Sequence, residues 1–239
     1  MEDEPYLERA YRSVIEPGLR CYPVVLGESD LYVCTTGGLS AAASESLATH
    51  RLELEAYLEK HFSFGTSFRP VPVASDAPAI VTAMAEAAEA FDVGPMASVA
   101  GAIAQFVGAD LLGSSGEVIV ENGGDLFIAG GKRRTVRIFA GAGSPSVNVV
   151  VDACPDGVGL CTSSATVGPS VSLGAADAVT VLARTATIAD AAATAIGNIL
   201  LRPEDIPDGL ELASGHELVD GVVIILQGSM GAWGKLEIA

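Results

Sequence analysis

The second half of the chain contains a run of short segments with β-strand character, and their spacing limits the possible folds more than any other feature. Five such segments are predicted between residues 117 and 162, at Glu117–Glu121, Asp125–Ala129, Thr135–Ala140, Val147–Asp152 and Val158–Thr162. Gly-rich turns separate several of them, which is the pattern of hairpins in an antiparallel sheet. This part of the chain is therefore predicted to form an antiparallel sheet.

Helices are predicted on both sides of this strand-rich region. They cover residues 1–20, an amphipathic leader helix, and Leu39–Phe62, Ala79–Phe91, Ala97–Leu112 and Ile188–Leu201. Further strands are predicted at Cys21–Leu26, Leu31–Thr36, Ala178–Ala183, Val222–Leu226 and Lys235–Ile238. Because helices lie between groups of strands, we expect an α+β fold with helices packed on one face of an antiparallel sheet. A duplicated strand–helix unit fits this order, but no sequence repeat supports it, and residues 1–239 are predicted to form one domain.

The charge of the chain excludes one class of partner. Its formal net charge is -17, whereas nucleic-acid binding needs clustered Lys and Arg to neutralise phosphates. The basic cluster Lys132–Arg134 is predicted to lie in a turn between strands. Hydrophobic residues make up 49% of the chain and aromatic residues 5%, so the core is expected to be aliphatic. Because the chain has no apolar run of about eighteen residues, we also expect a soluble protein that does not span a membrane.

The termini and cysteines predict a cytoplasmic protein. The N-terminal Met1–Pro5 has neither a basic region nor an apolar region of the kind that a secretory signal requires. Cys21, Cys34, Cys154 and Cys161 show no C-x-x-C pairing and no His at zinc-ligand spacing. We therefore expect reduced, structural thiols.

The segment from Thr187 to Asn198 allows two interpretations. Thr187 and Asp190 match the S/T-x-x-D/E pattern of a capping box at a helix N-terminus. Asp190 and Thr194 are also four residues apart, so both project from one side of the helix as hard oxygen ligands suited to Mg²⁺. The residues alone leave both interpretations open.

Three other segments gather small or polar residues. Asn122–Asp125 is either a plain hairpin turn or a place where Gly123 and Gly124 let a ligand approach the backbone. Thr162–Ser164 is either a solvated loop or a nest of hydroxyl and amide groups for phosphate. In Gly94–Ser98, Pro95 suits a rigid turn and Ser98 suits a helix N-cap.

Nucleophilic catalysis has no support in this pattern. No Ser-His-Asp arrangement marks Ser163 or Ser164 as a nucleophile, and no catalytic residue is assigned. His50, His61 and His216 are each expected at the surface.

Taken in order, these segments resemble the ApbE-type flavin transferases, and more closely their short, uncharacterised, cytoplasmic prokaryotic relatives. Family members carry a helix-opening loop D-L-G-G-I-A-K-G, a G-G-D turn, a T-S-G segment and a helix A-D-A-x-x-T-A. The matching segments here are Asp92–Val99, Gly123–Asp125, Thr162–Ser164 and Ala189–Ala195. The resemblance covers about residues 90 to 201.

The resemblance implies an ApbE-like α+β fold with a pocket for FAD or FMN and a Mg²⁺ ion. Carried over, the metal ligands are Asp190, Thr194 and the carbonyl of Ala97. The implied flavin contacts are Gly94, Ala97, Ser98, Asn122, Gly123, Gly124, Asp125, Thr162, Ser163 and Ser164. The ion would bind the FAD pyrophosphate, and its positive charge would let an acidic protein bind an anionic nucleotide. It would also promote FMN transfer to a threonine of an acceptor protein, or cleavage of the FAD pyrophosphate.

The chain departs from the family pattern at three places. The family's loop lysine is Ser98 here, a second acid along that helix is Ile103, and the H-I-x-D-P-x-T-G motif has no counterpart in Val167–Ser172. A non-catalytic flavin or nucleotide carrier is therefore the alternative to an enzyme, and an assembly protein using these segments only for turns and packing is the third hypothesis. An exposed sheet edge and aliphatic surface would also fit a homodimer.

Overall fold

The fold was analysed in a computed structural model, which describes residues 18–141, 146–166 and 172–239. The predicted leader helix falls almost wholly on residues 1–17, which lie outside the described residues. Arg20, the last residue of that prediction, instead begins the first strand.

Two antiparallel sheets form the framework. The larger has eight strands in the order β1-β2-β3-β4-β7-β8-β9-β10, and the smaller has three in the order β11-β6-β5. The bounds in the larger sheet are β1 Arg20–Leu26, β2 Ser29–Thr35, β3 Val118–Asn122, β4 Asp125–Gly130, β7 Cys154–Ser163, β8 Ala178–Ala183, β9 Val219–Leu226 and β10 Ser229–Gly234. Those in the smaller sheet are β5 Arg134–Ile138, β6 Val147–Val151 and β11 Glu237–Ile238. All neighbouring strands pair antiparallel, as predicted.

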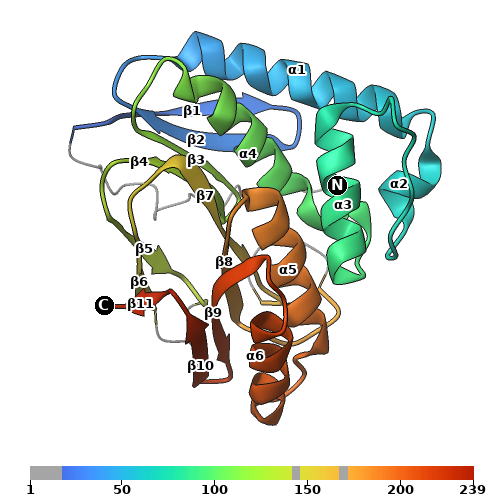
Figure 1. The fold of residues 1–239 in the computed structure, drawn as a ribbon, viewed down its shortest axis with the longest axis vertical. Helices are drawn as coiled ribbons and strands as arrows, with labels where there is room; N and C mark the ends of the chain where they lie inside the picture. Colours follow the sequence, from blue (N-terminus) through green and yellow to red (C-terminus); the bar gives the residue numbers. More distant parts are fainter. Residues whose placement is uncertain (1–17, 142–145, 167–171) are drawn as a thin grey trace, which may run out of the picture.

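The helices cover one face of the larger sheet, as Figure 1 shows. Their bounds are α1 Ser40–Leu58, α2 Phe62–Thr66, α3 Ala79–Phe91, η2 Pro95–Ser98, α4 Val99–Leu112, α5 Ala186–Ile199, η3 Pro203–Asp205 and α6 Ile206–Ser214. Helix α4 packs on β3 and β4, α5 on β7 and β8, and α6 on β9 and β10. The predicted α+β architecture is therefore confirmed. The duplicated strand–helix unit stays a prediction.

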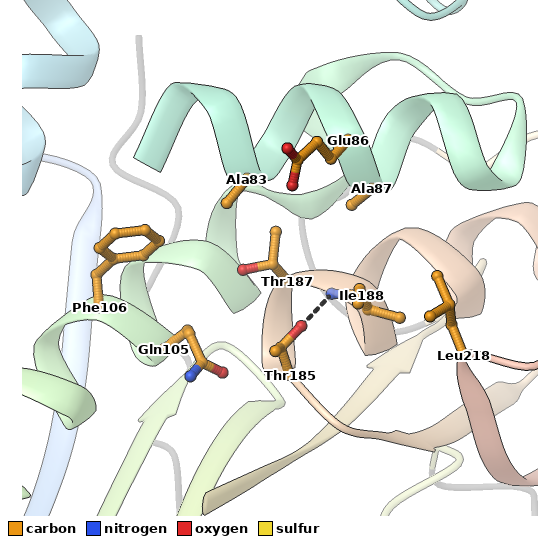
Figure 2. A pocket seen from close by; sticks show the side chains of 9 residues that line it. All are labelled: Ala83, Glu86, Ala87, Gln105, Phe106, Thr185, Thr187, Ile188 and Leu218. Atoms are coloured by element: carbon orange, nitrogen blue, oxygen red, sulfur yellow. Dashed lines mark hydrogen bonds between the residues drawn. The ribbon is translucent and has the colours of Figure 1, made fainter. Parts of the chain in front are cut away.

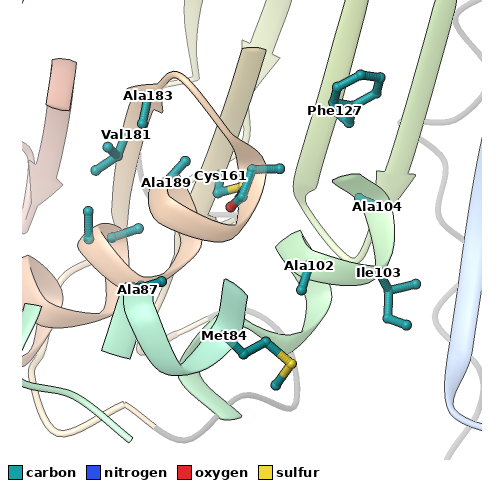
Figure 3. Close-up of a cluster of buried hydrophobic side chains, with 14 of the residues drawn as sticks. Met84, Ala87, Ala102, Ile103, Ala104, Phe127, Cys161, Val181, Ala183 and Ala189 are labelled. Atoms are coloured by element: carbon teal, nitrogen blue, oxygen red, sulfur yellow. Dashed lines mark hydrogen bonds between the residues drawn. The ribbon is translucent and has the colours of Figure 1, made fainter. Parts of the chain in front are cut away.

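The two faces of the large sheet bury two separate clusters of apolar side chains. Successive residues of a strand point to opposite faces. Phe127 of β4 therefore packs with the helices, whereas its neighbours Leu126 and Ile128 pack toward the smaller sheet. The helix-side cluster is mostly Ala, Val, Leu and Ile, as composition predicts, and Figure 3 shows the part where alanines of α4 and α5 meet Phe127 and Cys161. Small side chains there let the helices lie close to the sheet.

One described segment, Pro95–Leu112, has the length and apolar composition of a membrane-spanning helix. It comprises η2 and α4, and half of it is buried inside the protein. Its contacts with α1, α3, α5 and the strands β3 and β4 identify it as a core helix of this domain.

The helix predicted at Leu39–Phe62 ends earlier than expected. Helix α1 ends at Leu58, and the chain turns at His61 before the separate short helix α2. The turn brings Phe64 back toward α1, where its ring meets Tyr57 edge-on at 5.3 Å and is fully buried. Burial of this one aromatic ring explains why the helix does not continue to Phe62.

Helix α6 and strand β10 are among the elements that the sequence prediction missed. Helix α6 contains Pro207 and Gly209, which weaken the local helical signal, although Pro is compatible with the first turn. Strand β10 contains Gly231 and Gly234 and has low β-propensity, but it pairs along its whole length with β9. Both elements therefore depend on packing against β9.

The expected reduced state of all four cysteines is wrong for one pair. Cys21 and Cys34 occupy opposite positions on β1 and β2 and form a disulfide, with 4.1 Å between their Cα atoms. The antiparallel register brings them together, and sequence spacing alone could not show this. Cys154 and Cys161 are free, and Cys161 is buried. A cytoplasmic location stays a prediction.

We expect two titratable thiols in the denatured full-length chain without reductant and four after reduction, because only Cys154 and Cys161 are free. Thiol titration with a chromogenic disulfide reagent in guanidinium measures this directly. The Cys21→Ser variant serves as the control and should show three thiols without reductant, since Cys34 loses its partner. Four thiols in the unreduced wild type would contradict the pairing.

Candidate functional site

Segments predicted to belong to one site meet around the N-terminus of α4. The Gly101 amide donates to Asp190 Oδ2 at 2.8 Å, which joins α4 to α5. The Thr194 hydroxyl donates to the carbonyl of Ala97 at 3.4 Å. The Asn122 side-chain amide donates to the carbonyl of Ala100 at 3.1 Å. The fold thus brings the helix-opening loop, the β3–β4 turn and α5 into contact.

Gly101 makes the close approach of α4 and α5 possible. A Cβ atom at this position would lie 2.3 Å from the Ala186 carbonyl oxygen and 2.7 Å from the Asp190 Cβ. Gly101 was not among the site residues predicted from the sequence. Its position one helical turn after Ala97, on helix α4, is the sequence signal that could have identified it.

The capping-box interpretation of Asp190 is wrong. Helix α5 begins at Ala186, and the N-cap is Thr185, whose Oγ1 accepts from the Ile188 amide at 3.2 Å. The Asp190 carboxylate instead accepts from amides at the start of α4, those of Gly101 and Ala100. Asp190 therefore caps a neighbouring helix, a partner that no local sequence pattern identifies.

Two buried acids face the same helix–sheet interface. Burial raises the pKa of Asp125 to about 7, with a further rise from Glu121, while the hydrogen bond from the Thr162 amide lowers it. Burial also raises the pKa of Asp190 well above its ordinary value, and the negative charge of Asp125 raises it further. Each carboxylate thus disfavours ionisation of the other. A cation beside them would relieve this repulsion.

Cys161, on strand β7, lies near both Asp125 and Asp190. Its thiol donates to the Ala186 carbonyl at 3.3 Å, and burial together with the charges of Asp125 and Asp190 raises its pKa. A thiol held in this protonated state is a packing group and not a nucleophile. The prediction of a structural cysteine is supported at this position.

The turn at Gly123 and Gly124 has the geometry of a tight hairpin. Both residues have positive φ values, 69° and 111°, which glycine adopts without strain. Gly123 is exposed, and a Cβ added to it would meet nothing within 4 Å. The turn therefore forms the plain hairpin that the residues suggest and also leaves its backbone accessible to a ligand.

The side chains of the segment Thr162–Ser164 lie on different faces of the sheet. The Thr162 side chain points away from the helices and shares a 2.8 Å hydrogen bond with Thr180, so only its backbone amide reaches Asp125, at 3.2 Å. Ser163 points toward α5 near Gly197. The Ser164 hydroxyl donates to the Asp177 carbonyl at 2.7 Å. The three hydroxyls therefore do not form one nest, because alternate residues of a strand face opposite ways.

The helix-opening loop is held by packing as well as by its links to α5. A Cβ at Gly94 would lie 1.9 Å from the Ser67 carbonyl oxygen, so this glycine serves close backbone packing and not ligand approach. Ser98 is 1% exposed and occupies the N-cap position of α4, but its hydroxyl donates back to the Pro95 carbonyl at 3.0 Å. Ala97 in this loop is half-buried, and its carbonyl accepts the hydrogen bond from Thr194.

The histidines are more involved in packing than predicted. His50 is mostly buried and bonds Asp110 at 2.9 Å, and His216 stacks on Phe91 with 4.2 Å between ring centroids. The surface prediction is wrong for these two because their rings close contacts between segments far apart in the chain. His61 is exposed, as predicted.

The predicted metal ligands form a mixed oxygen set. Among the residues that the structure describes, no group of three or more His, Cys, Asp or Glu side chains could hold a metal. Asp190, Thr194 and Ala97 instead offer one carboxylate, one hydroxyl and one carbonyl oxygen, which is the chemistry that Mg²⁺ and Ca²⁺ prefer. These residues therefore fit a hard divalent cation.

The sequence model of the family described as "AbpE bacteria" matches residues 12–208. The chain belongs to this family. A UPF0280 protein of Methanocaldococcus jannaschii is 43% identical to it over 206 residues, which are 83% of this chain and 84% of the relative. The resemblance that the ordered motifs predicted is confirmed.

Solved structures share the fold of this chain at low sequence identity. The flavin transferase ApbE from Vibrio cholerae matches with a TM-score of 0.58 at 14% identity, covering 92% of this chain and 97% of that chain. The apbe protein from Thermotoga maritima matches with a TM-score of 0.57 at 12% identity, covering 89% of this chain and 96% of that chain. At these identities the likeness concerns the fold, which confirms an ApbE-like fold for this AbpE-family protein.

Proposed function

We propose that this protein binds a flavin nucleotide, FAD or FMN, over the β3–β4 turn and the contact between α4 and α5. The observation that carries the proposal is the 3.4 Å contact between the Thr194 hydroxyl and the Ala97 carbonyl, beside the buried Asp190 carboxylate. Residues 97 positions apart thereby bring two hard oxygen ligands together, and Asp190 lies one turn before Thr194 on α5. The proposal is supported by family membership and by the ApbE flavin transferases that share the fold.

Asp190, Thr194 and the Ala97 carbonyl would hold Mg²⁺ in this proposal. When bound, the ion supplies positive charge that a nucleotide pyrophosphate needs in a protein with a net charge of -17. The Asp190 carboxylate keeps its hydrogen bond to the Gly101 amide with one oxygen and has further lone pairs for a cation. Gly123 offers exposed backbone to the nucleotide, and Ser163 presents its hydroxyl on the same side of the sheet as α5.

Two activities are compatible with this site. The first is Mg²⁺-dependent transfer of FMN to an acceptor protein, or cleavage of the FAD pyrophosphate. The second is a flavin carrier without turnover, and two observations favour it. Ser98 takes the place of the family's lysine and is buried with its hydroxyl bonded to Pro95, and Ile103 takes the place of the family's second acid within the apolar core. AMP released from FAD with Mg²⁺ supports the first activity, and retention of intact FAD supports the second.

We expect FAD and Mg²⁺ together to raise the melting temperature of the wild type by roughly 5–10 °C. Ligand at about one hundred times its dissociation constant stabilises a protein by about 2.7 kcal/mol, and 1 kcal/mol shifts the melting temperature of a chain of this size by about 2–4 °C. Thermal-shift measurements with FAD, FMN and ADP, each with and without Mg²⁺, test the proposal.

The Asp190→Ala and Thr194→Val variants should lose the Mg²⁺-dependent part of this shift. Asp156→Ala, which removes an exposed carboxylate from β7, is the control for the change in charge and should keep it. Thr194→Val conserves shape, so it remains informative if removal of Asp190 harms folding. An equal shift in all four proteins would overturn the metal assignment, and no shift with any flavin would overturn the proposed function.

A further inference from the structure

A second candidate site lies at the first turn of α5, where α3, α4 and α5 surround a cavity of about 420 Å³. Figure 2 shows side chains from the three helices and from Leu218 around this space. Its volume falls within the range of about 300–1,000 Å³ typical of small-molecule sites. Most of the wall is apolar and includes Phe106, Ile188 and Leu218.

One polar group in this wall lacks a partner among the residues that the structure describes. Thr187 is 3% exposed, and its buried hydroxyl oxygen makes no hydrogen bond to any of them. In Figure 2 the hydroxyl points toward the side of the cavity where Phe106 and Gln105 lie. A buried hydroxyl without a partner is destabilising, and a ligand that bonds it would remove this cost.

The other polar groups indicate the charge of that ligand. Glu86 is exposed at the cavity wall, and Figure 2 shows its carboxylate directed from α3 toward the first turn of α5. Of the described residues that line the cavity, none is Lys, Arg or His. Two amides of this first turn already have partners, because Gln105 Oε1 accepts from Ala186 and Thr185 Oγ1 accepts from Ile188. Neither of these two amides is therefore free to bind an anion, and an anion in the cavity would also meet the Glu86 carboxylate.

We propose that this cavity binds a small organic ammonium ion with an apolar body. An ammonium group has three donors and no acceptor, which suits a carboxylate and a hydroxyl oxygen together. The apolar body would lie against Phe106, whose ring also favours a nearby cation. The site is separate from the proposed flavin site, because none of the residues that line the cavity belongs to that site.

The probe for this proposal is 2-phenylethylammonium, compared with 3-phenylpropionate and 2-phenylethanol by isothermal titration calorimetry on the full chain. We expect the ammonium ion to bind at least tenfold more tightly than the carboxylate. Thr187→Val, which conserves shape, should weaken ammonium binding about fivefold, the equivalent of one hydrogen bond. Glu86→Gln should weaken it about tenfold and leave binding of the alcohol unchanged.

Two further variants test whether the ammonium ion binds in this cavity and independently of the flavin site. Ala83→Leu extends a side chain into the cavity and should abolish binding, while the melting temperature reports whether the chain still folds. Asp190→Ala should leave ammonium binding unchanged, so failure of the flavin proposal does not affect this one. The proposal is overturned if the ammonium ion binds with a dissociation constant above about 10 mM, which corresponds to a binding free energy of roughly −2.7 kcal/mol. It is also overturned if the carboxylate binds as tightly as the ammonium ion, or if the Thr187→Val and Glu86→Gln variants both bind the ammonium ion as the wild type does.

Discussion

Replacement of Gly101 by alanine is expected to lower the free energy of unfolding by about 1–2 kcal/mol. The added methyl group would lie 2.3 Å from the Ala186 carbonyl oxygen and 2.7 Å from the Asp190 Cβ. The first of these is a backbone atom, so the clash cannot be relieved by rotating a side chain, and α4 must move away from α5. Overpacking of this kind costs about 1–3 kcal/mol, and the better helix propensity of alanine offsets only about 1 kcal/mol of a larger strain.

The same variant should weaken Mg²⁺ and flavin binding more than its stability loss alone implies. Separation of the two helices would lengthen the Gly101–Asp190 bond and the Thr194–Ala97 contact, which position the proposed metal ligands. Urea unfolding measures the stability, and the thermal shift with FAD and Mg²⁺ measures the site. A shift as large as that of the wild type would show that helix separation does not control the ligands.

Gly113→Ala, at the C-terminal end of the same helix, is the matched control. Gly113 follows α4 with ordinary helical dihedral angles, and a Cβ there would meet nothing within 4 Å. This variant should be neutral or slightly more stable, by up to about 1 kcal/mol, because alanine restricts the unfolded chain. If both variants lost the same stability, the close contact at Gly101 would not be the cause.

The second large expected effect is a fall in stability as the pH rises through the neutral range. Burial raises the pKa of Asp125 from 3.8 to about 7, so between these values the folded chain binds more protons than the unfolded chain. Stability from this group is therefore fully present below pH 3.8 and is lost as the pH rises through about 7. The difference corresponds to a change on the order of 4 kcal/mol across the whole window. The raised pKa of Asp190 acts in the same direction.

Asp125→Asn should flatten this dependence, since asparagine keeps an oxygen for the Thr162 amide and carries no charge. Urea unfolding at pH 5, 6, 7 and 8 measures the slope for wild type and variant. Asp156→Asn removes an exposed carboxylate from the same sheet and should retain the wild-type slope. A wild type whose stability rises from pH 5 to pH 8, or a variant with an unchanged slope, would contradict the assignment of the proton to Asp125.

Elements with strong local signals were predicted well from the sequence. The predicted helix Ala79–Phe91 has the same bounds as α3, and the predicted strand Ala178–Ala183 has the same bounds as β8. Both have a continuous apolar pattern ended by residues that stop it, such as Pro78 and Gly94 around α3. Strand β10 and helix α6 lacked such signals and form because β9 offers them a partner.

Some features of the candidate site could likewise be predicted from the sequence, and others could not. The order of its motifs, the tight turn at Gly123 and Gly124, and the spacing of Asp190 and Thr194 on one side of α5 are local properties, so the sequence alone determined them. The sequence could not show that Asp190 caps α4 instead of its own helix, that Thr162 points to the opposite face of the sheet, or that Cys21 pairs with Cys34. These features were decided by the tertiary structure, because each depends on an atom far away in the chain. Sequence patterns report periodicity and backbone preference over a few residues, whereas burial, strand register and helix contact determine which distant group a side chain meets.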